Sequence, residues 1–460
     1  MTYKTSIYIF HRSLRLDDNL GLIEALKNSE KVIPIFIFTP EQIGTNRYKS
    51  ERAIVFMINA LLDLNIHLRK KKSKLFMFYD KQHNIVSSLL KNDVDIEAVY
   101  INKEYTKYGI ERETKIEKVC NMYDVKLHSI SDYLLHDTKT ALTGSGGFYS
   151  KFTPFYNNII KNTVDVPLKN RYKNYVTSNY KPKKEVDIKR IQKIYDNDIT
   201  DEFPATRKEA LIRLLNIKDH KNYGKDRNDL TSYTTRLSPY IKFGLVSIRE
   251  VYDRIKQLYG KKHDLIKQLY WREFYYILAY NRPDIFNGKS FKPIYDKIEW
   301  KNDSNLFKKW KEGKTGFPIV DAGMRELNET GYMHNRSRLI TSNFMIKLLG
   351  TDWKKGERYY AQKLVDYDPC VNNGNWQWSA GSGADSQPYF RIFNPWTQGA
   401  KFDPQCIYIK KWVPELSDVA NKDIHNWEKE HKTYDVDYPE PCISYSKERI
   451  DIIKRYKKIY

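Results

Sequence analysis

The first 135 residues alternate between short apolar runs and longer amphipathic segments. The apolar runs are rich in β-branched and aromatic residues, which favours strands over residues 6–10, 31–38, 74–79, 98–101 and 126–130. The amphipathic spacing predicts helices over residues 20–29, 51–71, 84–91 and 108–122. Apolar strands that alternate with helices predict a doubly wound parallel α/β sheet. No GxGxxG motif follows the first run, so the usual dinucleotide fingerprint is missing.

The pattern changes near residue 136. Residues 161–202 are rich in Lys, Asn, Tyr and Asp without strong periodicity, which is typical of a solvated connector. From residue 203 to the end, helical periodicity dominates. We therefore expect an α/β domain over residues 1–135, an interdomain linker over residues 136–202 and an all-α domain over residues 203–460.

The net charge of the chain indicates which kind of partner it would bind. The chain has 79 basic and 57 acidic residues, a formal net charge of +22 and a pI near 9.4. This favours a polyanionic partner, nucleic acid before an anionic membrane surface. The abundance of Lys, Asn, Ile and Tyr also fits an AT-rich genome, so charge alone does not decide between these explanations.

The cysteines and the hydropathy of the chain indicate the cellular compartment in which it works. The four cysteines contain no CxxC pair, so we expect no metal site and a reducing compartment. The N-terminal apolar stretch is too short for a signal peptide and is interrupted at Arg12. No run approaches the roughly 18 apolar residues of a membrane helix. We expect an intracellular, soluble protein without a membrane partner.

Tryptophan points to the second domain as the place of the chemistry. All nine tryptophans lie at or after Trp271, and tryptophan usually marks a core or a site for a flat ligand. A tempting P-loop at residues 313–315 fails, because Lys308 stands where that motif needs its first glycine.

Two segments combine groups suited to a flat, charged ligand. Residues 234–238 place hydroxyls before a predicted helix, where donors suit a phosphate, although plain helix capping explains them as well. On a helix, Gln268, Trp271 and Arg272 share one face, which suits a stacked base or a heteroaromatic ring. The alternative is a core tryptophan beside an arginine that reaches solvent.

A third segment puts Asn335, Arg338 and Leu339 on one helical face. Carboxylates, amides and two tryptophans follow at Asp366, Asp368 and residues 372–378. These groups could frame the polar edge of a flat cofactor. The alternative is a buried salt bridge between Arg338 and Asp366.

Taken together, eight stretches resemble the photolyase/cryptochrome family. They are LRLDDN (14–19), TTRLSPYIKFG (234–244), WREFYY (271–276), GKTGFPIVDAGMREL (313–327), MHNRSRLI (333–340), DWKKGERYYAQ (352–362), NNGNWQW (372–378) and PYFRIFNP (388–395). The resemblance covers nearly the whole chain in order and is most specific over residues 223–416. Within the family it is most similar to the class I photolyases that repair cyclobutane pyrimidine dimers.

The resemblance implies an antenna domain, a linker and a helical domain that holds FAD in a U shape. The positions matching the family's cofactor contacts are Tyr223, Thr234, Thr235, Arg236, Leu237, Ser238, Gln268, Arg272, Asn335, Arg338, Asp366, Asp368 and Asn372. Of these, Arg338 and Asp366 would pair beside the isoalloxazine ring and Asn372 would face its N5 atom.

It also implies a carbon–carbon lyase that acts on UV-damaged DNA in light, by electron transfer from photoexcited reduced FAD to a flipped-out dimer. Flipping is needed because a dimer inside a duplex cannot reach a buried flavin. The implied lesion contacts are Gln268, Trp271, Asn335, Leu339 and Trp378. The implied DNA contacts are Arg227, Trp271, Arg272, Arg336, Trp378 and Arg391. Trp376, Trp353 and Trp300 match the family's electron-transfer chain to the surface.

Some positions depart from the family pattern. Class I enzymes often have glutamate at position 268 and methionine at 339, where this chain has Gln268 and Leu339. The glutamate that binds folate in some members corresponds to Gly109, which disfavours a folate antenna. A deazaflavin, a second flavin or an empty antenna pocket stay open.

Three functions compete. The first is a photolyase that repairs cyclobutane pyrimidine dimers, acts as a monomer and needs no protein partner. The second is a (6-4) photolyase, disfavoured because its histidine pair is reduced to His334. The third is a cryptochrome-like photoreceptor without repair, disfavoured by the intact Trp271, Asn335 and Trp378.

Overall fold

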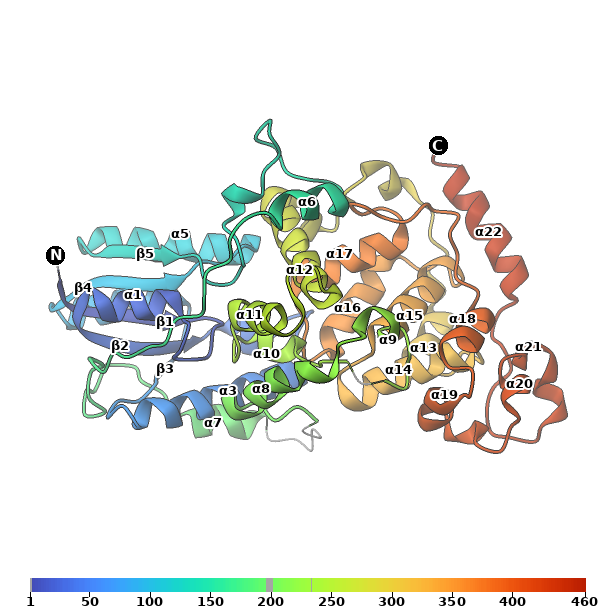
Figure 1. Cartoon of the computed structure of the whole chain (residues 1–460), viewed down its shortest axis with the longest axis horizontal. Helices are drawn as coiled ribbons and strands as arrows, with labels where there is room; N and C mark the ends of the chain where they lie inside the picture. The colour runs from blue at the N-terminus through green and yellow to red at the C-terminus, as the bar shows by residue number, and fades with distance from the viewer. Residues whose placement is uncertain (1, 196–201, 233) are drawn as a thin grey trace. The chain divides into compact units, whose positions relative to one another are not determined.

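The computed structural model of the chain describes residues 2–195, 202–232 and 234–460 (Figure 1). Packing divides it into two compact units. Unit 1 comprises Met1–Lys221 and Thr235–Pro283, and unit 2 comprises Asn222–Thr234 and Asp284–Tyr460. Residues 196–201 of the predicted linker lie outside the described residues, and the predicted boundaries after residues 135 and 202 stay predictions.

Unit 1 contains a five-stranded parallel sheet with the order β3-β2-β1-β4-β5 (Figure 1). The strands are β1 (Tyr3–Phe10), β2 (Ser29–Phe38), β3 (Phe76–Tyr79), β4 (Ile96–Asn102) and β5 (Lys126–Ile130). In the register, Ile7 lies opposite Ile33 on one side and Val99 on the other. The predicted α/β class is confirmed, with each predicted strand found within three residues of its expected bounds.

Helices cover both faces of this sheet. Ile7 and Ile9 share a buried core with Ile85 of α4 (Gln82–Asn92) and Ile116 of α5 (Lys107–Met122). Neighbouring side chains of a strand point to opposite faces. Tyr8 accordingly turns the other way and donates a 2.7 Å hydrogen bond to Asn19, the N-cap of α1 (Leu20–Lys27).

The rest of unit 1 is helical. Its elements are α2 (Pro40–Ile43), α3 (Glu51–Arg69), η1 (Thr138–Ala141), α6 (Phe152–Ile159), α7 (Ile188–Ile194), α8 (Arg207–Leu215), η2 (Asn216–Asp219), α10 (Ser238–Lys242), α11 (Ile248–Tyr259) and α12 (Asp264–Asn281). The predicted interdomain linker over residues 136–202 contains α6, a packed helix in which Phe152, Phe155 and Ile159 are buried. Their spacing places all three on one helical face, which packs against α12.

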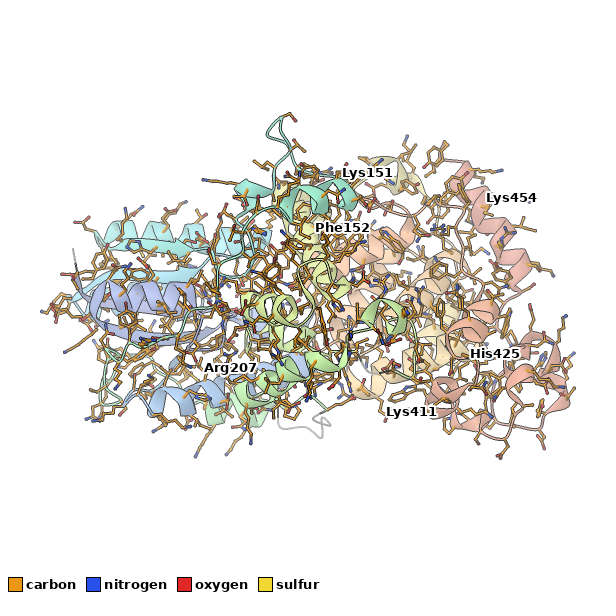
Figure 2. The ribbon with its side chains drawn as sticks, in the orientation of Figure 1. Lys151, Phe152, Arg207, Lys411, His425 and Lys454 are labelled. Carbon is orange, nitrogen blue, oxygen red and sulfur yellow. The ribbon has the colours of Figure 1, made fainter. Side chains whose placement is uncertain are left out.

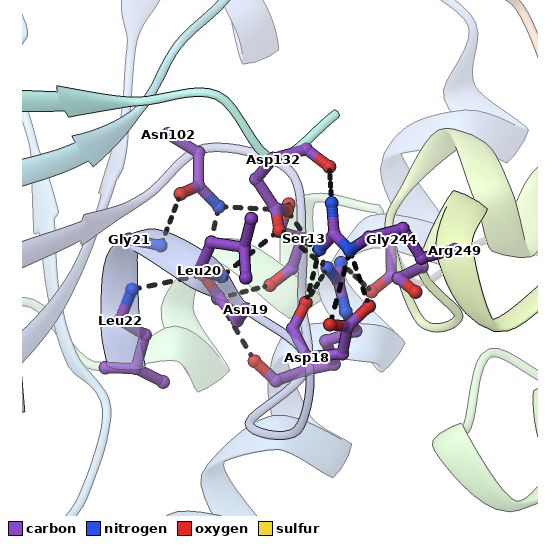
Figure 3. A network of polar contacts seen from close by, with 12 residues as sticks. Ser13, Asp18, Asn19, Leu20, Gly21, Leu22, Asn102, Asp132, Gly244 and Arg249 are labelled. Atoms are coloured by element: carbon purple, nitrogen blue, oxygen red, sulfur yellow. Dashed lines mark hydrogen bonds and ion pairs between the residues drawn. The ribbon is translucent and has the colours of Figure 1, made fainter. Parts of the chain in front are cut away.

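A buried ionic network joins α11 to the sheet (Figure 3). Arg249 donates to both carboxylate oxygens of Asp18 at 3.1–3.3 Å and to Asp132 at 2.6 Å. Arg15 contacts the same Asp132 at 3.0 Å. Burial raises the pKa of Asp132, but the two arginines outweigh this and lower it to about 2. The carboxylate therefore stays ionised although its side chain is 1% exposed.

Gly244 completes this junction. Its φ is +67°, and a Cβ there would lie 2.3 Å from the Cα of Ser13. The neighbouring Phe243 carbonyl accepts a 3.0 Å hydrogen bond from the Leu14 amide. Only glycine permits this close approach of two backbones, which explains the residue that ends the 234–244 stretch.

Unit 2 is built from helices in the part of the chain that the structure describes. The first helix is the short α9 (Tyr223–Asp226). The helices from residue 283 onward are η3 (Pro283–Asn287), η4 (Pro293–Lys297), α13 (Ser304–Glu312), α14 (Pro318–Thr330), α15 (Asn335–Lys347), α16 (Trp353–Lys363), α17 (Pro369–Ala380), α18 (Pro395–Phe402), α19 (Ile407–Trp412), η5 (Pro414–Leu416), α20 (Asn421–Ile424), α21 (Trp427–Glu430), η6 (His431–Thr433) and α22 (Tyr445–Lys457). Their core includes the buried Trp310, Trp376 and Trp427. No described helix is long and apolar enough to cross a membrane.

Candidate functional site

In unit 1, α12 presents the predicted Gln268, Trp271 and Arg272. Trp271 is half-buried, and its ring stacks on Phe152 with centroids 3.7 Å apart and planes at 5°. Gln268 is also half-buried and donates to the carbonyl of Asp264 at 3.3 Å. Trp271 thus has one face covered, while part of its surface stays accessible.

Arg272 is held inside unit 1 by aromatic rings. Its guanidinium lies 4.2 Å from the ring centre of Tyr133 and 4.8 Å from that of Tyr276. It also pairs with Glu273 at 3.2 Å. With 13% of its side chain exposed, it would have to leave these contacts to reach a phosphate.

Glu273 was not predicted from the sequence. Its side chain is 1% exposed, and its carboxylate accepts a 3.0 Å hydrogen bond from the Leu135 amide. Burial raises the pKa of Glu273 to about 7, against the opposing effects of Arg272 and the backbone donors. A carboxyl group that titrates near neutrality therefore fastens α12 to the segment that leads to α6.

The 234–238 stretch has an unusual backbone turn. Arg236 has a φ of +48°, and its guanidinium bonds Glu202 and lies 4.6 Å from the Phe203 ring centre. Leu237, not a hydroxyl residue, occupies the N-cap of α10. Helix capping by Thr234, Thr235 or Ser238, the alternative raised by the sequence, is therefore not what the structure shows.

In unit 2, Arg338 and Asp366 form the expected pair. Arg338 Nη2 lies 3.0 and 3.2 Å from the two Asp366 oxygens, and Nε donates to the Met333 carbonyl at 2.9 Å. Burial lowers the pKa of Arg338, but Asp366 outweighs it and the net pKa is raised. The pair joins α15 to the turn before α17.

The start of α17 arranges two more predicted residues. Asp368 is its N-cap and accepts from the amides of Cys370 and Val371 at 3.0 and 3.2 Å. One turn later, Asn372 donates through Nδ2 to Oε1 and to the carbonyl of Glu357, both at 3.0 Å. These bonds fix the orientation of the Asn372 amide.

Three of the predicted tryptophans belong to the core of unit 2 or line it. Trp376 is 2% exposed and Trp353 3%, while Trp300 is partly buried. Gly356 lies one helical turn after Trp353, and a Cβ there would lie 2.2 Å from the Trp376 ring. The glycine therefore lets the ring of Trp376 rest directly on the helix that begins with Trp353.

The remaining predicted residues of unit 2 lie nearer the surface. Asn335, Arg227 and Arg391 are exposed, whereas Tyr223, Leu339 and Trp378 are half-buried. Arg336 donates to Asn228 Oδ1 at 2.6 Å and lies 4.3 Å from the Phe402 ring centre. Asn335, Arg338 and Leu339 share α15, and α17 packs against that helix.

The groups present fit a flavin dinucleotide better than a metal. Among the described residues, no cluster of three His, Cys, Asp or Glu side chains could hold a metal ion, and the four cysteines are free thiols. In contrast, His334 is 7% exposed and its Nε2 has no partner in the described chain. Burial and the nearby Arg338 and Arg336 lower the pKa of His334 to about 4, so it stays neutral. An unused ring nitrogen near Arg338 and Arg336 suits a polar ligand.

The motif discarded as a P-loop has a structural use. Asp321 accepts from the Thr315 amide and hydroxyl at 2.9 and 2.7 Å, and from the Gly316 amide at 2.9 Å. It also accepts from the Tyr438 hydroxyl at 2.6 Å. The loop amides are thus used by a protein carboxylate, which confirms that this segment is no phosphate loop.

Comparison with known families agrees with this chemistry. Residues 265–458 match the FAD binding domain of DNA photolyase, and residues 6–170 match the model described as DNA photolyase. These matches define a flavoprotein with an α/β domain and a helical FAD-binding domain. FAD is therefore its cofactor.

Individual relatives agree along the full length. The deoxyribodipyrimidine photo-lyase of Buchnera aphidicola is 34% identical over 98% of this chain and 96% of its own. The archaeal photolyase from Sulfolobus tokodaii, solved with two FAD molecules, is 39% identical with a TM-score of 0.88, over 99% of this chain and 100% of its own. A class III photolyase from Agrobacterium tumefaciens is 30% identical with a TM-score of 0.91, over 100% and 98%. The chain belongs to the photolyase/cryptochrome family.

Proposed function

We propose that this chain is a deoxyribodipyrimidine photo-lyase, which uses light to split cyclobutane pyrimidine dimers in UV-damaged DNA. The observation that carries the proposal is the Arg338–Asp366 pair together with the fixed amide of Asn372, both in the region that matches the family's FAD-binding domain. Bound and reduced, FAD supplies the light-driven electron that opens the cyclobutane ring and receives it back. The chain's own residues bind and orient FAD and the lesion, and they exclude water from the site.

The residues proposed to hold FAD are those at positions that match the family's cofactor contacts. They are Tyr223, Thr234, Thr235, Arg236, Leu237, Ser238, Gln268, Arg272, Asn335, Arg338, Asp366, Asp368 and Asn372. Hydroxyl, amide and guanidinium donors suit the phosphates. The paired charges of Arg338 and Asp366 offer both a donor and an acceptor to the polar edge of the ring system.

For the lesion, we propose stacking on Trp271 and Trp378. Aromatic contacts replace the stacking lost on flipping, on the order of 1–3 kcal/mol per base. Gln268 and Asn335 then read the polar edges, and Leu339 fills the apolar side. Gln268 can donate a hydrogen bond but carries no charge, so recognition here relies on shape and neutral hydrogen bonds.

For the DNA backbone, we propose Arg227, Arg336 and Arg391, with Arg272 contributing only if it leaves its aromatic contacts. The net charge of +22 supports a salt-dependent, sequence-independent affinity. Arg227 and Arg391 are exposed, so their guanidinium groups are accessible to phosphates.

Trp376, Trp353 and Trp300 are proposed to carry electrons from the surface of unit 2 to oxidised FAD. A second chromophore is proposed for the sheet of unit 1. A flavin is preferred, since the relative from Sulfolobus tokodaii carries two FAD molecules. A deazaflavin is the alternative, and folate is disfavoured by Gly109. We further propose an intracellular, soluble monomer that needs no protein partner.

The test is a blue-light repair assay on chemically reduced protein. One oligonucleotide carries a cyclobutane thymine dimer and another carries a (6-4) photoproduct, with dark controls. Light-dependent restoration of the first alone is expected. Restoration of only the second would assign a (6-4) photolyase. Restoration of neither, with reduced FAD bound, would assign a photoreceptor.

A further inference from the structure

Phe152 occupies a special place beside Trp271. The two rings are nearly parallel at 3.7 Å, and Phe152 is 2% exposed whereas Trp271 is half-buried. On Phe152, Tyr156 adds a third ring at 5.6 Å and 18°. The planes of Trp271 and Tyr156 are thus each close to parallel with the plane of Phe152.

The sequence explains why Phe152 is held firmly. It is the first residue of α6, and Pro154 stands in the first turn, where proline fits a helix without losing a hydrogen bond. Figure 2 labels Phe152 at the start of α6. Its ring also meets Phe274 of α12 edge-on, at 5.8 Å and 85°. Contacts on a face and an edge leave the Phe152 plane little freedom to turn.

Phe155 provides an internal comparison. It lies one turn later on the same buried face of α6 and is 0% exposed. Its contacts to α12 go to Phe274, at 5.5 Å and 45°. Phe155 therefore contributes packing of a similar kind without stacking on Trp271.

We propose that Phe152 is a positioning residue for DNA repair, which holds the indole of Trp271 in the plane that receives the flipped pyrimidine dimer. This inference rests on the proposed function, in which Trp271 stacks on the lesion. A ring fixed beforehand binds its partner without losing rotamer freedom on binding. Phe152 itself touches no DNA, so its effect is restricted to the lesion and does not extend to the backbone.

The experiment measures affinity for a duplex with one thymine dimer and for the undamaged duplex, using FAD-loaded full-length protein in the dark. Phe152→Leu keeps apolar volume but removes the flat face, and Phe155→Leu is the matched control. We expect Phe152→Leu to weaken dimer binding by about three- to tenfold, the loss corresponding to one unfixed side chain. Affinity for undamaged DNA and FAD content should stay as in the unmodified protein, and Phe155→Leu should leave the damaged-to-undamaged ratio unchanged. If Phe152→Leu does not fold, Phe152→Met gives the same test with an unbranched side chain.

A double-variant cycle separates positioning from general packing. If Phe152 acts through Trp271, Phe152→Leu should have no further effect on dimer affinity once Trp271→Ala is present. Additive losses, equal losses in Phe152→Leu and Phe155→Leu, or an unchanged ratio in Phe152→Leu would each overturn the inference. Failure of the proposed function is distinguishable, because the unmodified protein would then show no light-dependent repair and no preference for the dimer.

Discussion

Asn372 donates through a single nitrogen to two oxygens of Glu357, the carbonyl and Oε1, both at 3.0 Å. Because Nδ2 is engaged, Oδ1 is the atom that the amide has left to offer a ligand. An oxygen acceptor suits a protonated ring nitrogen, which reduced flavin has and oxidised flavin lacks at N5. If Asn372 faces N5, as the family resemblance implies, we expect Glu357 to favour the reduced flavin by fixing this amide orientation.

A first prediction concerns this pair. Glu357→Leu should let the Asn372 amide turn, so the reduced form of bound FAD should be reoxidised by air several-fold faster in the dark. The measurement follows flavin absorbance after photoreduction. Glu329→Leu, on the exposed side of α14, serves as control, and an unchanged reoxidation rate in Glu357→Leu would contradict the role of Glu357.

The tryptophan assignment gives a second prediction. Trp353→Phe keeps an aromatic ring in the core but replaces indole by a ring that is much harder to oxidise. Photoreduction of oxidised FAD should be lost, while repair by chemically reduced protein should be retained. Trp412→Phe in α19 lies outside the proposed chain and should photoreduce normally. Normal photoreduction in Trp353→Phe would remove this residue from the path.

A third prediction concerns the Arg338–Asp366 pair. The Asp366 side chain is 5% exposed, so Arg338→Leu leaves a buried carboxylate without its guanidinium partner. We expect a loss of about 3 kcal/mol in the free energy of unfolding, together with reduced FAD content. Denaturant unfolding of apoprotein and the flavin-to-protein absorbance ratio measure the two effects.

The double variant Arg338→Leu, Asp366→Leu serves as control for that experiment. It should regain most of the stability, because no buried charge is left unpaired. FAD content should stay low, since the polar edge is still missing. Full recovery of FAD binding would show that the pair is only structural.

Glu273 gives a fourth prediction, on pH. Its pKa is raised by burial to about 7 from the ordinary 4.5, so between these values the folded chain binds more protons than the unfolded chain. The free energy of unfolding should therefore fall as pH rises through this window, by at most roughly 3 kcal/mol. Glu273→Gln cannot ionise and should lack this fall. Denaturant midpoints across the window measure it, with the exposed Glu111→Gln as control. Parallel pH profiles of Glu273→Gln and the unmodified protein would contradict the assignment.

The sequence was most informative where one segment determines its own structure. Strands β1 to β5 were predicted within three residues because each is a short run rich in β-branched, aromatic or other apolar residues, and β1 to β4 are largely buried. The four-residue α2 was missed, since a single turn carries no periodic signal. Phe152, Phe155 and Ile159 have helical spacing, but the Lys- and Asn-rich stretch that follows them favoured a connector.

Partner choice was harder to predict. The Arg338–Asp366 bond appeared among the sequence alternatives because both residues stand in polar motifs, and the structure confirms it. The bond from Asn372 to Glu357 and the stack of Trp271 on Phe152 join residues on different helices. Such pairs depend on how helices cross, which local periodicity does not encode. The individual roles of the site residues in binding FAD and DNA stay predictions.

The ionic network around Arg249 also constrains how the chain is made. Asp132 is synthesised 117 residues before its partner Arg249, and Asp18 precedes it by 231. On a ribosome that builds about 5–20 residues each second, the last strand is synthesised several seconds before Arg249 can pair with these carboxylates. Until α11 is synthesised, the α/β segment has the Arg15–Asp132 pair but lacks both bonds to Arg249. A chain shortened before residue 249 keeps the residues of all five strands but loses the Arg249 guanidinium that pairs with Asp18 and Asp132.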